Sequence, residues 1–299
     1  MIRTAEEGPV TFRLGLWGRL VAFPHSIFAL PFALGMFVLC AARFRVSLTQ
    51  FLLILVCLVA ARTAAMACNR VLDARIDASN PRTLAREIPS GRVSLGEASL
   101  LWAASTCVFL GGAYLLGSHC LLLTPVVLLV LFGYSLTKRF TPWSHLVLGF
   151  ALALAPGGVW YALTATWSLL PVPLMTAVLF WVAGFDVLYS CQDEAFDRSQ
   201  GLFSVPARFG VARAFAIAKT FHGIAVLLLI LFGFMWQLTP WYYVFVAVFA
   251  AFLVKQYSLI SPEDLSRIDA AFFTQNGLAS FSFLISTIVE WSLFSSGPQ

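Results

Sequence analysis

Charged residues are scarce in this sequence. Of its 299 residues, 11% are charged and 60% are hydrophobic, and the mean hydropathy is +0.87. Because a water-soluble protein carries about 25% charged residues, this shortage excludes a soluble domain. We expect no nucleic acid among the partners of such a chain.

The sequence also lacks the cysteine and histidine patterns that hold soft metals. Six cysteines are spread along the chain without a Cys-x-x-Cys pair, and the four histidines are scattered. We therefore interpret the cysteines as small apolar residues inside helices. Among the histidines, only His25, beside Pro24, lies near a plausible site. The N-terminal residues are polar and mixed in charge, so we expect no cleavable signal peptide.

Long apolar runs recur along the whole chain, and each reaches or approaches the roughly 20 residues that cross a bilayer. The pattern predicts an all-α polytopic membrane protein, a single domain over residues 1–299 built as a bundle of nine transmembrane helices around a central cavity. The predicted spans are 16–40, 48–70, 95–116, 121–139, 144–165, 170–191, 212–235, 239–258 and 272–295.

The basic residues are distributed unequally between the two membrane faces that these spans define. Sixteen Lys and Arg residues fall on the side of the N-terminus, against only Arg43 and Arg45 on the other side. Basic residues concentrate in cytoplasmic loops. We therefore expect a cytoplasmic N-terminus and an inner-membrane location. The two longest polar loops, about 70–94 and 192–211, then face the cytoplasm as well.

Two clusters of aspartate are conspicuous because acidic residues are so rare. The chain has seven aspartates: Asp73 and Asp77 form the first cluster, Asp193 and Asp197 form the second, and Asp186 lies one heptad before Asp193. Each cluster lies at the end of an apolar run, where a carboxylate beside lipid is energetically costly. Such residues are expected to serve a function.

Three helices are expected to carry polar side chains on one face, because steps of four and seven residues return to the same side of a helix. All three end at the predicted cytoplasmic face, so we expect a shared polar opening there. The three sets are Arg62, Asn69, Asp73 and Asp77; Asp186, Asp193 and Asp197; and Tyr134 and Lys138.

Facing carboxylates repel one another unless a cation lies between them. Oxygen ligands at flexible spacing suit Mg²⁺, which is commonly bridged to the phosphates of a substrate. The surrounding Arg and Lys side chains suit phosphate oxygens. Together these groups predict a diphosphate site, and in a bundle embedded in lipid the diphosphate is expected to belong to a long isoprenoid. Solvated loop ends would explain one Asp-x-x-x-Asp pair, but they explain two pairs in line with Arg62 poorly.

The motifs resemble those of a known family, the UbiA-type prenyltransferases. Asn69–Asp77 (Asn-x-x-x-Asp-x-x-x-Asp), followed by Ile88–Gly91, is similar to the family's first motif. Asp193–Asp197, followed by Ser204–Gly210, is similar to the second. Tyr134–Lys138 is similar to the Tyr-x-x-x-Lys element. The resemblance covers nearly the whole chain, and it departs from the family pattern at two positions. Arg70 stands where many members have Asp, and Glu87 stands where proline is common.

The resemblance implies Mg²⁺-dependent transfer of a polyprenyl group from a polyprenyl diphosphate to an aromatic acceptor, in membrane lipid. Ionisation of the donor leaves an allylic cation, which an aromatic-rich cavity would stabilise and protect from water. The acceptor ring then attacks and loses a proton. The implied Mg²⁺ ligands are Asn69, Asp73, Asp77, Asp193 and Asp197.

The remaining site residues have roles that the resemblance also implies. Lys138 and Tyr134 would stabilise charge on the leaving pyrophosphate, acting with the catalytic residues Asp73 and Asp193. Arg86 would bind the substrate. For the acceptor, Asp186 is placed to bind or polarise it. The carboxylate of the acceptor would be held by Arg62 or His25, of which Arg62 is preferred.

The identity of the acceptor is left between two classes. The commonest acceptor implied by the family is 4-hydroxybenzoate, which gives a ubiquinone precursor. Two segments, Phe23–Phe32 and Asn80–Thr83, look more like a subgroup assigned to menaquinone synthesis through futalosine, whose acceptor is a related carboxylated aromatic. A secondary transporter is the alternative of a different class, but transporter carboxylates usually lie near the midplane on broken helices. A structural protein would leave the two facing clusters unexplained.

Overall fold

The bundle is made of helices throughout the part of the chain that the structure describes. The computed structural model describes residues 10–21, 28 and 30–295. Eight helices are long and apolar enough to cross a membrane, and the shorter α2 (Leu30–Ala41) is apolar as well. The expected all-α bundle of nine apolar helices is confirmed. The eight long helices are α3 (Leu48–Leu72), α5 (Leu95–Leu116), α6 (Ser118–Thr137), α7 (Ser144–Thr164), α8 (Val172–Ser190), α11 (Val211–Met235), α12 (Pro240–Leu259) and α13 (Asn276–Ser295).

The predicted first span, 16–40, is not a single helix. Instead, α1 (Val10–Leu20) ends at Leu20 and α2 begins at Leu30. Pro31 is the second residue of α2, where the missing N–H of proline costs nothing because the first N–H groups of a helix have no partner within it. This proline, which we expected inside a span, therefore marks the start of a helix.

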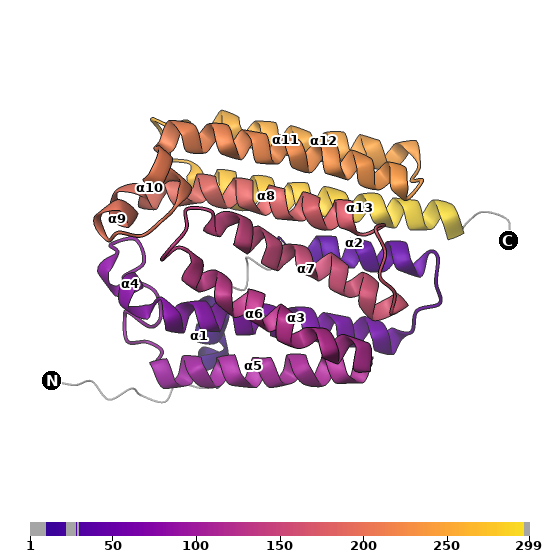
Figure 1. Cartoon of the computed structure of the whole chain (residues 1–299), viewed down its shortest axis with the longest axis horizontal. Coiled ribbons are helices and arrows are strands. Elements are labelled where there is room, and N and C mark those ends of the chain that lie inside the picture. Colours follow the sequence, from indigo (N-terminus) through magenta and orange to yellow (C-terminus); the bar gives the residue numbers. More distant parts are fainter. Residues whose placement is uncertain (1–9, 22–27, 29, 296–299) are drawn as a thin grey trace.

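Both long polar loops carry short helices. The loop after α3 contains α4 (Ala74–Ser79), and the loop after α8 contains the 3₁₀ turn η2 (Cys191–Asp193), α9 (Glu194–Ser199) and α10 (Val205–Phe209). Figure 1 shows α4, α9 and α10 together at one end of the bundle. We call these elements and the residues that join them the polar end.

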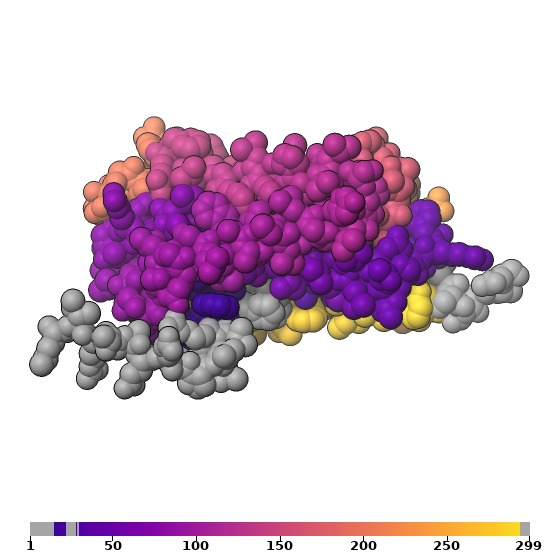
Figure 2. All heavy atoms as spheres, turned by 90° about the horizontal axis from the view of Figure 1, so that it is seen from below, coloured from indigo at the N-terminus to yellow at the C-terminus, as the bar shows by residue number. Residues whose placement is uncertain are grey.

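Helix α8 lies at the centre of the bundle. It packs against α7 and α11. Elsewhere, α3 packs against α5, and α13 packs against both α2 and α12. In Figure 1 the long helices run along the long axis, from the polar end to the opposite end. Seen from below in Figure 2, residues of the first half of the chain cover most of the visible face, and α13 is visible only along its lower edge. The helices that carry the two acidic clusters therefore reach the same end.

Helices α5 and α6 expose large apolar side chains. Leu122 and Leu129 of α6 are 77% and 73% exposed, and Leu100 of α5 is 70% exposed. An apolar surface of this extent marks contact with an apolar partner, which for a polytopic bundle is lipid. These two helices accordingly form part of the lipid-facing side.

The core beside α8 is aromatic. Trp181 is fully buried, and its ring centroid lies 5.1 Å from that of Phe32 on α2 and 5.0 Å from that of Phe185 on α8. Its indole Nε1 donates a hydrogen bond of 3.0 Å to Oδ1 of Asn276. Packing in the core therefore also depends on one polar side chain of α13.

Asn276 supports the irregular start of the last span. The preceding segment, η3 (Ala270–Gln275), is a π-helix. The side-chain Nδ2 of Asn276 donates to the carbonyl oxygens of Ala271 at 3.3 Å and Phe272 at 3.0 Å. A buried carbonyl without a partner would cost free energy, so this one side chain stabilises the wider turn.

We expect Asn276→Ala to lower the free energy of unfolding by about 1–3 kcal/mol, because it leaves the buried indole N–H of Trp181 without its acceptor. Thr220→Ala is the matched control, since its exposed hydroxyl bonds to the carbonyl of Ala216 on the same helix. Thermal unfolding of the detergent-purified protein measures both. Equal melting temperatures for the two variants would contradict the expectation.

Candidate active site

A small polar cavity of about 150 Å³ lies at the polar end of the bundle. Both acidic clusters line it, together with the ends of α3 and α6 and the loop after α4. Its wall is formed by Asn69, Arg70, Asp73, Ile76, Asp77, Asn80, Arg82, Thr83, Arg86, Lys138, Asp193, Phe196 and Asp197. The structure thus brings together seven of the predicted site residues, which are Asn69, Asp73, Asp77, Arg86, Lys138, Asp193 and Asp197.

Asp73 makes the most contacts in the first acidic cluster. We call the stretch from Asn69 to Asp77 the first acidic segment and the stretch from Asp193 to Asp197 the second. Asp73 lies between α3 and α4 and is 2% exposed. Its Oδ2 accepts a hydrogen bond from Asn69 Nδ2 at 3.0 Å and pairs with Lys138 Nζ at 2.9 Å. Arg139 reaches Oδ1 at 3.5 Å. Because Lys138 follows the last residue of α6, these ion pairs tie α6 to the end of α3.

The first acidic segment keeps its helical spacing although the helix is interrupted. α3 ends at Leu72 and α4 begins at Ala74, with Asp73 in a non-helical conformation between them. The N–H of Asp73 still donates to the carbonyl of Asn69 at 2.9 Å, and the N–H of Asp77 donates to that of Asp73 at 2.8 Å. The three polar side chains consequently remain on the wall of one cavity.

Asp77 lies one turn after Asp73 and is also buried. Arg86 donates a hydrogen bond of 2.8 Å to Oδ1, and the hydroxyl of Thr83 donates to the backbone carbonyl of Asp77 at 2.9 Å. The other carboxylate oxygen, Oδ2, is buried and has no hydrogen-bond partner among the described residues. Asp77, a residue of the cavity wall, therefore has one carboxylate oxygen without a partner among the described residues.

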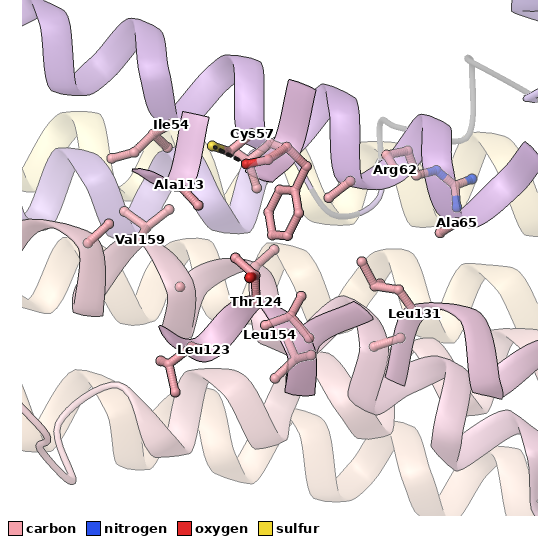
Figure 3. A pocket seen from close by; sticks show the side chains of 18 of the residues that line it. Ile54, Cys57, Arg62, Ala65, Ala113, Leu123, Thr124, Leu131, Leu154 and Val159 are labelled. Carbon is pink, nitrogen blue, oxygen red and sulfur yellow. Dashed lines mark hydrogen bonds between the residues drawn. The ribbon is translucent and has the colours of Figure 1, made fainter. Parts of the chain in front are cut away.

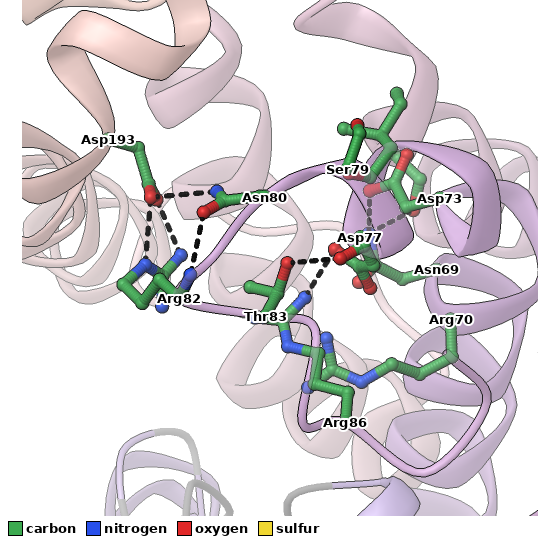
Figure 4. Close-up of polar contacts among 12 residues, drawn as sticks. Asn69, Arg70, Asp73, Asp77, Ser79, Asn80, Arg82, Thr83, Arg86 and Asp193 are labelled. Carbon is green, nitrogen blue, oxygen red and sulfur yellow. Dashed lines mark hydrogen bonds and ion pairs between the residues drawn. The ribbon is translucent and has the colours of Figure 1, made fainter. Parts of the chain in front are cut away.

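Asp193 is held by residues that follow the first acidic segment. Arg82 donates from Nε to Oδ1 at 2.8 Å and from Nη2 to Oδ2, while Asn80 Nδ2 donates to Oδ1 at 3.0 Å. Figure 4 shows this group beside the contacts of Asp77. Burial disfavours a charged guanidinium, but the hydrogen bonds to Asp193 and its negative charge outweigh it, so the pKa of Arg82 lies above its ordinary value. Arg82 stays charged and joins the two acidic segments.

Asp186 lies apart from the polar cavity that Asp193 and Asp197 line. It belongs to α8, about two helical turns before Asp193, and its carboxylate pairs with His145 at 2.7 Å.

A second, apolar cavity of about 230 Å³ lies between α3, α5, α6 and α7. Figure 3 shows Arg62 and Ala65 towards one end of it and Ile54 and Ala113 towards the other. Most of its wall is aliphatic. The aromatic residues in the wall are Phe109, Tyr134 and Tyr161. The expectation of an aromatic-rich cavity is therefore corrected: the cavity is apolar but mainly aliphatic.

The polar and the apolar cavity follow one another along α3 and α6. On α3, Arg62 lines the apolar cavity and Asn69, two turns later, lines the polar one. On α6, Tyr134 lines the apolar cavity, and Lys138, one turn later, lines the polar one. Nε of Arg62 is buried and has no hydrogen-bond partner in the described part of the chain. The expected central cavity thus corresponds to a polar and an apolar cavity that have no lining residue in common.

Sequence reasoning missed three residues of the site. Asn80 and Arg82 hold Asp193, and His145 holds Asp186. The only signal for the first two was the segment Asn80–Thr83, which we had used for the acceptor and not for contacts. The predicted site residue His25 lies outside the described residues.

The two departures from the family pattern have structural partners. Arg70 is buried, and its Nε donates a hydrogen bond of 3.1 Å to the carbonyl of Leu20 in α1. Glu87 pairs with Arg19 of α1 at 3.8 Å and with Arg92 at 3.5 Å. Both residues therefore attach α1 to the polar end.

The polar cavity fits a divalent metal such as Mg²⁺ that takes few protein ligands and shares its shell with phosphate. No group of three or more acidic, histidine or cysteine side chains among the described residues could hold a metal ion alone. Mg²⁺ commonly takes one or two carboxylates, and waters and substrate phosphates complete its shell. The carboxylate and amide oxygens of the wall, and above all the partner-free Oδ2 of Asp77, fit a site shared with phosphate.

Comparison with known proteins identifies the family. The sequence pattern of the UbiA prenyltransferase family matches residues 28–281. This chain belongs to that family. It is an integral membrane protein and a prenyltransferase, and the transporter and structural-protein alternatives are set aside.

Relatives and solved structures agree in length and fold. The 4-hydroxybenzoate octaprenyltransferase of Francisella tularensis subsp. mediasiatica is 25% identical over 283 residues, 94% of this chain and 93% of that protein. The enzyme of the same name from Pseudomonas fluorescens is 28% identical over 260 residues, 85% of each. An apo UbiA homolog from Aeropyrum pernix K1 has a TM-score of 0.81 and 35% identity, covering 89% of this chain and 97% of that chain. A UbiA homolog from Archaeoglobus fulgidus bound to GPP and Mg²⁺ has a TM-score of 0.70 and 19% identity, covering 93% and 99%.

We expect a double-mutant cycle on Arg82 and Asp193 to give a coupling free energy of about 1 kcal/mol, because the pair is bidentate and only partly exposed. The control is the pair of Arg198 and Glu194 within α9, which is more exposed and should give about 0.3–0.5 kcal/mol. Thermal unfolding of the single and double variants measures both. A coupling at Arg82 no larger than the control would show that this ion pair does not join the two segments.

Proposed function

We propose that this prenyltransferase moves a polyprenyl group from a polyprenyl diphosphate to an aromatic carboxylate, with Mg²⁺ as cofactor. The first candidate for the acceptor is 4-hydroxybenzoate, which places the enzyme in quinone biosynthesis. The observation that carries the proposal is the succession of a polar and an apolar cavity along α3 and α6, with Arg62 and Tyr134 in the wall of the apolar one. A prenyl diphosphate has the same two parts, a charged head and an apolar chain.

The charge balance of the polar cavity supports a diphosphate that arrives with a metal. Four aspartates and four Arg or Lys side chains line the cavity. A diphosphate alone would leave an excess of negative charge in this partly buried space, whereas a diphosphate with a divalent cation adds little net charge. A diphosphate bound together with a divalent cation therefore matches the charge of the cavity better than either one alone.

The residues that would supply the protein ligands of Mg²⁺ are Asn69, Asp73, Asp77, Asp193 and Asp197, with one or two carboxylates on an ion and phosphate oxygens and waters completing its shell. When bound, Mg²⁺ would supply positive charge to the diphosphate oxygens. The partner-free Oδ2 of Asp77 supports a ligand role for that residue. The Archaeoglobus fulgidus homolog of related fold, which is bound to GPP and Mg²⁺, supports Mg²⁺ as the cofactor.

In the transfer step, the bond between the first prenyl carbon and the diphosphate oxygen breaks, and its electron pair leaves with the diphosphate. Lys138, Arg86 and Tyr134 would stabilise the charge that develops there. The aliphatic wall of the apolar cavity would exclude water from the resulting allylic cation. A ring carbon of the acceptor forms the new carbon–carbon bond, and the ring then loses a proton, for which the released diphosphate is an available base.

Arg62 is the proposed anchor for the acceptor carboxylate. It lines the apolar cavity, and its Nε is buried without a partner among the described residues, which is the environment in which an arginine gains most from a carboxylate. Asp186 would bind or polarise the other end of the acceptor. The names of the two curated relatives support 4-hydroxybenzoate as that acceptor.

A second acceptor class rests on one observation. The segment Asn80–Thr83, which looks like that of futalosine-pathway enzymes, forms part of the cavity wall. A related carboxylated aromatic from menaquinone synthesis would present the same carboxylate to Arg62. Competition between the two acceptors in one assay decides between them.

The proposed orientation places the polar end at the cytoplasmic face of the inner membrane. Lys138, Arg139 and the arginines of the loop after α4 all lie at this end. Their concentration there is typical of a cytoplasmic face.

The direct test is prenyl transfer by the detergent-purified protein, supplied with geranyl or longer diphosphate, Mg²⁺ and 4-hydroxybenzoate. We expect Asp73→Ala and Asp193→Ala to lower kcat/KM by about a hundredfold or more, because each removes a charge at the reacting diphosphate. Removal of Mg²⁺ with EDTA should stop turnover.

Thermal unfolding of the same variants controls for loss of structure. Transfer at the wild-type rate in either variant, or with EDTA present, would make the proposed mechanism wrong. Transfer to neither aromatic carboxylate would reject the acceptor class while leaving the donor open.

We expect Gly158→Leu to shift the enzyme towards shorter donors. Gly158 lines the apolar cavity, and a side chain added there meets no atom within 4 Å, so it would occupy the space of the chain. The ratio of kcat/KM for a long donor to that for geranyl diphosphate should fall by roughly tenfold, since each lost methylene contact is worth about 0.8 kcal/mol. Gly133→Leu is the control, because it has equal space but lies outside the wall of the cavity. An unchanged ratio would place the chain elsewhere.

A further inference from the structure

His145 connects two parts of the site that lie on different elements. The ring is buried and lies in the first turn of α7. Its Nδ1 is 2.7 Å from Oδ2 of Asp186 on α8, and its Nε2 accepts a hydrogen bond of 3.3 Å from the N–H of Val205 at the start of α10. Both ring nitrogens are therefore used, each by a different element.

The two contacts define which nitrogen carries the proton. A backbone N–H can only donate, so Nε2 of His145 must be an acceptor towards Val205. In a neutral imidazole the proton then lies on Nδ1, which donates to the carboxylate of Asp186. The ring is thus a donor on one side and an acceptor on the other.

The contact with Val205 connects His145 to the residues that would bind the prenyl diphosphate. Ser204, the residue before Val205, caps α10, and two residues earlier the N–H of Leu202 donates to the backbone carbonyl of Asp197, which lines the polar cavity, at 2.8 Å. In the same segment, the N–H of Phe203 donates to the carbonyl of Lys138 at 2.7 Å. By holding the Ser204–Val205 peptide, His145 supports the position of Asp197.

The contact with Asp186 connects His145 to the carboxylate that, in the proposed function, binds or polarises the aromatic substrate. Oδ2 of Asp186 is held by His145, while 27% of its side chain remains accessible. A carboxylate that is fixed through one oxygen presents the other in a defined direction, as histidine–carboxylate pairs do in other active sites. The direction of Asp186 therefore depends on Nδ1.

We propose that His145 is a positioning residue for prenyl transfer with two separable tasks. Through Nδ1–H it orients Asp186 for the acceptor, and through Nε2 it holds the Ser204–Val205 peptide and thereby Asp197 for the donor diphosphate. The inference rests on the proposed function, since it assigns the two contacts to the two substrates.

Two substitutions separate the tasks. In His145→Asn the amide N–H₂ lies near the place of Nδ1, so it keeps a donor for Asp186 and loses the contact with Val205. In His145→Gln the amide reaches the place of Nε2, so its oxygen keeps an acceptor for Val205 and loses the contact with Asp186.

Each contact can also be removed by substituting the residue that His145 contacts. Val205→Pro deletes the N–H that donates to His145, at the first position of α10, where proline is well accommodated. It should therefore reproduce His145→Asn. Asp186→Asn weakens the other contact and should reproduce His145→Gln. A variant that fails to fold leaves its counterpart to test the same contact.

Two readouts follow the two substrates. Calorimetric affinity for geranyl thiodiphosphate with Mg²⁺ reports the donor site without turnover, and the KM for 4-hydroxybenzoate reports the acceptor site. We expect His145→Asn and Val205→Pro to weaken thiodiphosphate binding by roughly tenfold and to leave the acceptor KM unchanged. We expect His145→Gln to raise the acceptor KM by roughly tenfold and to leave thiodiphosphate binding unchanged.

A shift of both quantities in both His145 variants would mean that the histidine only supports the structure, and it would overturn the inference. No shift in either variant would overturn it as well. If the wild-type protein neither binds the thiodiphosphate nor transfers a prenyl group, the proposed function fails and the inference fails with it. Wild-type activity without the expected split rejects the inference alone.

Discussion

The pairing of buried carboxylates with cations is the constraint on which the polar end depends. A carboxylate at the edge of an apolar bundle is tolerated only if a partner offsets the loss of its hydration. Two of the partners come from elements far apart in the chain, so those pairs also fix the position of one element against another, whereas the third follows its carboxylate by nine residues. The pairs are Asp73 with Lys138, Asp77 with Arg86 and Asp193 with Arg82.

The same pairing bears on the proposed function. In that function the cations would bind the phosphate oxygens, and the carboxylates that now pair with them would hold Mg²⁺. Every charge would then keep a partner, which avoids leaving an ion alone in a space of low dielectric constant. The apolar cavity further along α3 and α6, with Arg62 and Tyr134 in its wall, would receive a chain that has no charge to satisfy.

Much of the fold follows from local patterns. The length and period of the apolar runs predicted the helices within a few residues, as in the case of 95–116, which matches α5. The break between α1 and α2 was not predicted, because an apolar run with proline is compatible with either a kinked or a divided helix. Helical spacing grouped Asn69, Asp73 and Asp77 correctly on one wall, because even the interrupted backbone keeps its hydrogen bonds there.

By itself, the sequence determined the membrane class, the nine apolar helices and the two acidic segments at one end, because hydrophobic length and helical period are local properties. Only the tertiary structure decided which partner each carboxylate has. The contacts of Asp193 with Arg82 and of Asp186 with His145 join residues more than a hundred and about forty positions apart. The first contact depends on how the loop after α4 meets the loop after α8, and the second on the packing of α7 on α8. Neither leaves a periodic signal that spacing along one helix could reveal.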